Sequence, residues 1–132
     1  MCIRDSGTSD VITAWDQAET THDYSLTTGP GDYTVTISGT AEAWYFNNLG
    51  DKDKVISVTQ LGELGWTSFQ NAFAGCTNLA TFTPGTTDTS AVTDMFGMFH
   101  AASSLTSLDL SFFNTSAAVS YTHLTLPTIY SV

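Results

Sequence analysis

A repeat of 26 residues places the strongest constraint on how this chain can fold. When the sequence is shifted by 26 positions, apolar residues fall on apolar residues and one turn sequence falls on another, without a gap. The matched pairs are Phe73 with Phe99, Leu79 with Leu105, Phe82 with Leu108, and "DTSA" at 88–91 with "NTSA" at 114–117. A repeat of this length is typical of solenoids, in which each unit covers the apolar face of its neighbour.

The apolar spacing changes within each unit. One set recurs every three to four residues, as on one face of a helix, and consists of Trp66, Phe69 and Phe73, then Val92, Met95, Phe96 and Phe99. The next stretches, "CTNLATF" and "ASSLTSLDL", have the leucine spacing of a strand-like rung. We therefore expect a short helix followed by a rung at 66–85 and again at 92–111. A capping strand is expected near 55–59.

The same pattern predicts a shared core and an uncovered end. We expect six side chains to be buried together: Phe73, Phe99, Leu79, Leu105, Leu108 and Leu110. Stacked repeats normally need about three units and a polar cap. With two units, the last rung is expected to expose Leu105, Leu108, Leu110 and Phe112 along an edge prone to aggregation.

The two ends of the sequence are related through the genetic code. If "MCIRD" is encoded as ATG TGT ATA AGA GAC, its reverse complement translates as "VSYTH", the sequence at 119–123. Such inward-facing words resemble the mosaic end of the transposase used to tag sequencing libraries. We therefore expect residues 1–6 and 119–132 to be adapter-derived, and the native segment to run from Gly7 to about Ala117.

Charge and cysteine content narrow the function classes. The formal net charge is −10, and it is unchanged when Arg4 and Asp5 are set aside with the adapter. A chain this acidic is a poor ligand for nucleic acid phosphates, and no apolar run approaches the ~20 residues of a membrane span. With Cys2 in the adapter segment, Cys76 has no disulfide partner, and we expect it to be a small buried side chain.

The stretch "TDTSAVTDMFGMFHAASSLTSLDLSFFNTS" resembles the BspA-like bacterial surface protein repeat, a leucine-rich-repeat group with a 26-residue unit. The resemblance covers roughly Trp66 to Ala117. It departs from the family pattern at Ala101 and Ala102, where Gly-Cys is usual, and in "TFTPGTT", which is a poor rung. The resemblance implies a solenoid on a cell-surface or secreted bacterial protein that takes part in adhesion.

Upstream, "THDYS" resembles the His-x-Tyr of PKD-like β-sandwiches, and the stretch from "GDYTVTISGT" to "CTNL" resembles the segment that joins such a domain to these repeats. Tyr33, Val35 and Ile37 alternate with polar residues, which predicts a half-buried strand over 32–39. The expected fold is β-rich, with a truncated PKD/Ig-like β-sandwich segment at 7–50, a capping or junction strand at 51–65, and two leucine-rich-repeat-like solenoid turns with short helices at 66–118.

Residues that could carry chemistry are few. His22, His100 and His123 lack metal-ligand spacing, and neither a nucleophile elbow nor a phosphate-binding glycine loop is present, so we predict no catalytic, cofactor or metal residues. Asp51 and Asp53 in "GDKDK" leave open a calcium site, although a solvated turn is favoured. The Trp44–Phe46 cluster leaves open sugar stacking, although core packing is favoured. Asn114 begins a glycosylation sequon, but its repeat-mate Asp88 favours a turn role.

Two function classes follow. The first is a non-catalytic extracellular module of a bacterial protein, which binds an extracellular protein or glycan through exposed rung positions such as Thr106, Ser107 and Asp109. The second is an accessory segment of a secreted, carbohydrate-active enzyme whose catalytic domain lies outside this sequence. The resemblance favours the first. Further 26-residue units and an anchor in the parent gene would support it, whereas a domain with paired catalytic carboxylates would support the second.

Overall fold

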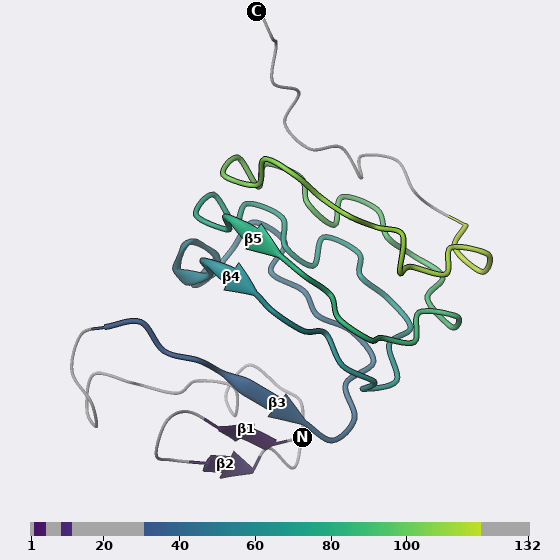
Figure 1. Cartoon of the computed structure of the whole chain (residues 1–132), viewed down its shortest axis with the longest axis horizontal. Coiled ribbons are helices and arrows are strands. Elements are labelled where there is room, and N and C mark those ends of the chain that lie inside the picture. Colours follow the sequence, from purple (N-terminus) through teal and green to yellow (C-terminus); the bar gives the residue numbers. More distant parts are fainter. Residues whose placement is uncertain (1, 5–8, 12–30, 120–132) are drawn as a thin grey trace, which may run out of the picture. The chain divides into compact units, whose positions relative to one another are not determined.

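The chain divides into two compact units after Thr40 (Figure 1). The structure is a computed structural model, which describes residues 2–4, 9–11 and 31–119. The first unit is Met1–Thr40 and the second is Ala41–Val132. The boundary predicted after residue 50 differs from this one, because residues 41–50 bond to the second unit: Ala41 N donates to Leu64 O, and Phe46 N donates to Ala72 O.

The first unit contains a small antiparallel sheet in the order β2-β1-β3. Its strands are β1 (Cys2–Arg4), β2 (Ser9–Val11) and β3 (Thr36–Ser38). In β3, Ile37 is half-buried between two exposed neighbours, as expected for the strand predicted over 32–39. Among the described residues of this unit a second sheet, which a sandwich requires, is not found.

The strand β1 departs from the sequence analysis, which places residues 1–6 outside the fold. Its residues lie at the centre of the sheet, where Ile3 is opposite Ile37 on one side and Asp10 on the other. Strand pairing uses backbone N–H and C=O groups, so the free edge of β3 can accept any extended segment. The pairing therefore does not depend on how these residues were encoded.

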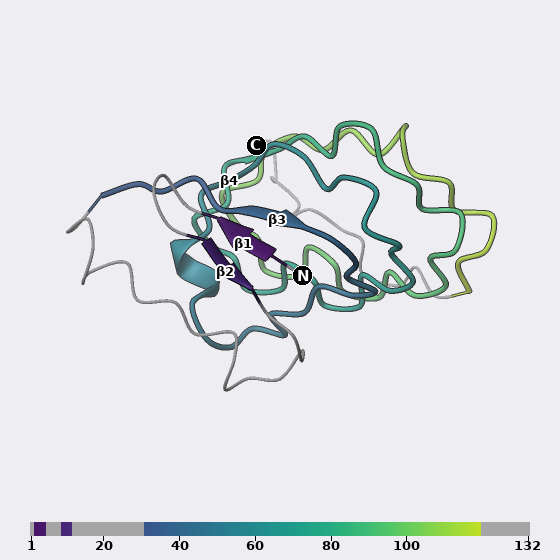
Figure 2. The same ribbon diagram turned by 90° about the horizontal axis from the view of Figure 1, so that it is seen from below.

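The second unit is built from layers of chain that run in parallel (Figures 1 and 2). We name these layer 1 (41–66), layer 2 (67–92) and layer 3 (93–118). Isolated bridges join Ala43 to Ser68 and Ser68 to Asp94, both in parallel register. Strand β4 (Ser57–Val58) in layer 1 pairs in parallel with β5 (Thr81–Phe82) in layer 2. Each layer is therefore bonded to the next at intervals of 24 to 26 residues.

In the segment where the first helix was predicted, successive backbone N–H groups alternate between acceptors in layer 3 and acceptors within layer 2. The N–H groups of Phe69, Asn71, Phe73 and Gly75 donate to carbonyls of layer 3, each at 2.8 Å. The intervening N–H groups of Ala72, Ala74 and Cys76 donate to carbonyls three residues earlier in layer 2. An α-helix would use every N–H within the segment, so bonding to the next layer excludes it.

The predicted helices at 66–73 and 92–99 are therefore wrong. Within residues 31–119 the structure contains one short 3-10 helix, Lys52–Lys54, and is otherwise strand, turn and irregular chain. Left-handed backbone conformations recur at matching places: Asn71 has φ 50° and Gly97 has φ 63°, while Gly75 has φ 76° and Ala101 has φ 58°. A positive φ ends a right-handed helix, so the repeat places a turn at each of these positions.

The core lies inside the layers and is aromatic. The ring of Phe73 stacks on that of Phe99, with centroids 5.8 Å apart and planes at 11°. Phe82 meets both rings edge-on, at 5.4 Å from Phe73 and 4.8 Å from Phe99. The pair Phe73 and Phe99, matched by the 26-residue shift, thus occupies equivalent places in adjacent layers. Leu79 and Leu105 are also buried, at 0% and 2% exposure.

The last predicted rung is only partly uncovered. Leu105 is buried, contrary to the expectation that it lies along an open edge. Leu108 and Leu110 are half-buried rather than fully buried, and Phe112 is 61% exposed. The backbone N–H of Leu105 donates to Ala102 O, so Leu105 lies in a turn at the start of the predicted rung.

Candidate binding face

Strands β4 and β5 present alternate residues to solvent. Ser57 is opposite Thr81 in the parallel register, and both are exposed. Val58 and Phe82 lie between the exposed positions and are half-buried and buried respectively. Thr59 and Thr83, the next residues along, are again exposed. The strand period of two therefore gives a core face and a hydroxyl-bearing outer face.

Layer 3 continues this outer face. Hydrogen bonds between layers 2 and 3 flank the rung on both sides: Gly75 N donates to His100 O, and Asn114 N donates to the side-chain Oγ1 of Thr89. The segment between them runs beside β5 (Figure 1). In the 26-residue register Ser107 follows Thr81 and Asp109 follows Thr83, and both are exposed. We call Ser57, Thr59, Thr81, Thr83 and Ser107 the hydroxyl grid.

The three predicted binding residues therefore lie on the solvent side of layer 3. Thr106, Ser107 and Asp109 are all exposed, and the last two extend the hydroxyl grid. Sequence reasoning missed the rest of this face. The shift that matches Phe73 with Phe99 also places Thr81 on Ser107, which was the signal available for extending the face into layer 2.

Hydroxyl groups outside the grid are used to bond layers together. Thr67 Oγ1 donates to Glu42 O at 3.2 Å, and Thr87 Oγ1 donates to Gly62 O at 2.8 Å. The buried Thr89 both donates to Asn114 O and accepts from Asn114 N, at 3.3 and 2.7 Å. By contrast, within residues 31–119 we find no protein partner for the grid hydroxyls.

Asp109 has a structural role as well as an exposed position. Its Oδ1 accepts the backbone N–H of Ser111 at 2.9 Å. This bond and the Ser111 side chain hold the pKa of Asp109 below its ordinary value. Asp88 makes the same turn with Ser90 at 2.9 Å, and the Ser90 side chain and N–H lower its pKa. The repeat-mate Asn114 accepts Ser116 N at 3.1 Å, which confirms the predicted turn role.

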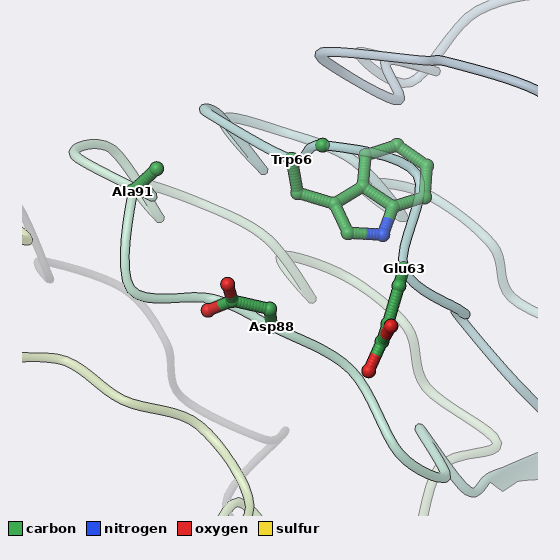
Figure 3. A pocket seen from close by; sticks show the side chains of 5 residues that line it. Glu63, Trp66, Asp88 and Ala91 are labelled. Atoms are coloured by element: carbon green, nitrogen blue, oxygen red, sulfur yellow. The ribbon is translucent and has the colours of Figure 1, made fainter.

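A shallow open hollow of about 320 Å³ lies beside layer 2 (Figure 3). It is lined by Glu63, Gly65, Trp66, Asp88 and Ala91. The indole N–H of Trp66 is not available to a ligand, because it donates to the carbonyls of Leu61 and Gly62. The Asp88 carboxylate accepts from Ser90, so at neutral pH it is an ionised acceptor with no proton to donate. These groups form no nucleophile-and-base pair.

The "GDKDK" segment (50–54) lies in layer 1 and is hydrogen-bonded to layer 2 through Asp53. Lys52 Nζ lies 2.7 Å from Asp53 Oδ2, and Lys54 Nζ lies 3.0 Å from Asp51 Oδ1. Asp53 also accepts the Thr77 hydroxyl at 2.7 Å, while its backbone carbonyl accepts Asn78 Nδ2 at 2.8 Å. The bond from Lys52, and then that from Thr77, lowers the pKa of Asp53. Both carboxylates, considered above as calcium ligands, are paired with lysines.

The aromatic cluster at 44–46 is divided between two faces. Trp44 and Phe46 are half-buried and meet edge-on, with centroids 5.5 Å apart, whereas Tyr45 is 57% exposed. This arrangement confirms that contiguous residues on an extended segment point to opposite sides. Trp44 Nε1 is buried and has no hydrogen-bond partner among the residues that the structure describes. One ring alone, Tyr45, is open to a ligand in this cluster.

Cys76 is fully buried, as expected. Burial is the main reason that the pKa of its thiol is raised to about 11, with Lys52 opposing the shift. In a Cys2→Ser background at pH 8, we expect iodoacetamide to modify Cys76 at least about a hundredfold more slowly in the folded chain than in urea, because the thiolate is the reactive form. Mass spectrometry of timed samples measures both rates, and equal rates would contradict the burial.

The described residues offer few other sites for chemistry. In the part of the chain that the structure describes, no group of three or more His, Cys, Asp or Glu side chains could hold a metal ion. His22 and His123 lie outside the described residues, and His100 is exposed on layer 3. No helix in the described part is long and apolar enough to cross a membrane.

Comparison with known proteins does not assign the chain to a family. No family model matches it, and no curated protein or solved structure matches it either.

Proposed function

We propose that this chain is a non-catalytic binding module of a bacterial cell-surface or secreted protein. In this proposal layers 1 to 3 are successive turns of a leucine-rich-repeat-like solenoid, and the first unit is part of a PKD-like domain that acts as a spacer. The observation that carries the proposal is the row of exposed polar residues on the strand side of all three layers. Such a surface suits broad, shallow recognition of an extracellular protein or glycan.

The arrangement of the polar groups supports binding rather than turnover. Carboxylates that are hydrogen-bonded in the described part, such as Asp88 and Asp109, accept backbone N–H groups in turns. A carboxyl group that acts as a general acid at neutral pH instead needs an enclosed setting that raises its pKa toward the working pH. Here the pKa values of both groups are lowered.

The experiment compares two carboxylates that accept equivalent hydrogen bonds in turns: Asp88 in layer 2 and Asp109 in layer 3. Asp109→Ala and Asp88→Ala each remove an acceptor for an N–H two residues ahead, so their effects on the turn are matched. We expect Asp109→Ala to weaken binding to extracellular matrix proteins or glycans about tenfold, since it removes a charged hydrogen-bond acceptor from the outer face. Asp88→Ala should leave binding unchanged.

Binding is measured on arrays of matrix proteins and glycans and then by titration calorimetry. Asp109→Asn separates charge from turn formation, because the amide oxygen still accepts Ser111 N. Substrate turnover by the purified parent protein that depends on residues 41–118 would contradict the proposal, as would equal binding by the Asp109→Ala and Asp88→Ala chains.

A further inference from the structure

The hydroxyl grid differs from most other threonines of layer 2, Thr86 apart, because its hydroxyls have no protein partner among the described residues. Layer 2 and its junction with layer 3 contain five threonines that donate to protein acceptors: Thr67, Thr77, Thr87, Thr89 and Thr93. Thr81 and Thr83, on strand β5, have no such partner among the described residues, and neither do Ser57 and Thr59 beside them. Their hydroxyls are therefore free to bond a ligand without breaking a bond within the fold.

The grid is regular in two directions. Neighbouring strands of a sheet lie about 4.7–4.9 Å apart, and side chains on one face of a strand recur every ~6.6 Å. The parallel pairing of Ser57 with Thr81 fixes the first spacing, and the exposed pair Thr81 and Thr83 fixes the second. A ligand that uses several of these positions at once must itself repeat polar groups at short, even intervals.

We propose that the hydroxyl grid binds a neutral, linear polysaccharide. This inference rests on the proposed function and names the class of ligand for the same face. A polysaccharide carries hydroxyl groups along its whole length, and each one both donates and accepts, as the serine and threonine hydroxyls of the grid do. In this proposal the polysaccharide lies across the strands, so that successive sugars contact successive layers.

The composition of the grid and the charge of the chain disfavour two other kinds of ligand, a protein and an anionic polysaccharide. Protein interfaces depend on a few buried Trp, Tyr or Arg side chains, and the grid contains none of them. Anionic polysaccharides are disfavoured by the net charge of −10 and by Asp109 at the end of the grid. The lysines within residues 31–119, Lys52 and Lys54, are already paired with aspartates.

The test is affinity electrophoresis of the full chain through gels that contain dextran, mannan or xylan, with alginate and heparin gels as the anionic set. We expect retardation by at least one neutral polymer and by neither anionic one. Thr81→Val with Thr83→Val should raise the apparent Kd about tenfold, because two hydroxyl groups that bond the ligand are lost. Valine keeps the branched shape that suits an exposed strand, so folding is preserved, which circular dichroism verifies.

Thr86→Val is the matched control, because Thr86 is an exposed threonine of layer 2 outside the grid. This variant should bind like the unaltered chain. Equal retardation of the double valine variant, or retardation by the anionic polymers alone, overturns the inference. Binding to a matrix protein with no retardation by any neutral polymer overturns the inference while the proposed function stands. If the chain bound none of the proteins and glycans tested, both the inference and the proposed function would be contradicted.

Discussion

Phe99→Ala should lower the free energy of unfolding of the second unit by about 3–5 kcal/mol, the usual cost of deleting a buried aromatic ring. Phe99 is fully buried and stacks on Phe73, and Phe82 packs against its edge. Removing the ring therefore leaves a cavity between layers 2 and 3 and takes two aromatic contacts with it. Urea unfolding followed by tryptophan fluorescence measures the change.

Phe112→Ala is the matched control for this prediction. It removes the same atoms from the same layer, but Phe112 is 61% exposed. We expect its free energy of unfolding to stay within about 0.5 kcal/mol of the unaltered chain, as for most surface substitutions. If the two variants lost equal stability, the aromatic core of layers 2 and 3 would not be packed as described.

Gly97→Ala should be the second most damaging substitution, with a loss of about 2–3 kcal/mol. Gly97 has φ 63°, a left-handed conformation that costs an alanine about 1–2 kcal/mol. A Cβ at this position would also collide with the side-chain oxygen of Asn71 in layer 2. The loss therefore has a local part and a part that arises from contact between layers, and chemical denaturation measures their sum.

Gly62→Ala isolates the local part. Gly62 has φ 67°, but nothing lies within 4 Å of the Cβ that alanine would add. We expect this control to lose only the ~1–2 kcal/mol of the backbone conformation. Adding Asn71→Gly to Gly97→Ala should recover the difference, because it removes the colliding oxygen. A double variant no more stable than Gly97→Ala would show that this contact does not limit the stability.

The sequence predicts which residues occupy equivalent core positions in layers 2 and 3 better than it predicts their backbone conformation. The gap-free shift of 26 identifies Phe73 and Phe99 as equivalents, and their rings stack. The apolar spacing of three to four residues predicted helices, and this prediction was wrong. A series of turns in which every second N–H bonds to the next layer also brings residues three and four apart to the same side of the chain. The left-handed positions Asn71 and Gly97 were the local sign of turns, but neither residue type excludes a helix by itself.

Layer 1 was not predicted as an equivalent of the others because its register is not constant. Ser57 pairs with Thr81 at an interval of 24, while Ala43 bridges Ser68 at 25 and Ser68 bridges Asp94 at 26. A search at one fixed interval therefore matches layer 2 to layer 3 but fails between layers 1 and 2. This also explains why a fixed shift of 26 could not extend the candidate face to Ser57 and Thr59 of layer 1.

The alternation of backbone donors has a consequence for how such a chain can change in length. Because Phe69, Asn71, Phe73 and Gly75 each bond a carbonyl one layer ahead, an insertion or deletion inside a layer moves every later donor away from its acceptor. It also turns inward-facing aromatic residues toward solvent. Duplication or loss of one whole layer moves none of them. Genetic variants of this architecture should therefore differ by entire layers, with each added layer extending the outer row of hydroxyl groups by one strand.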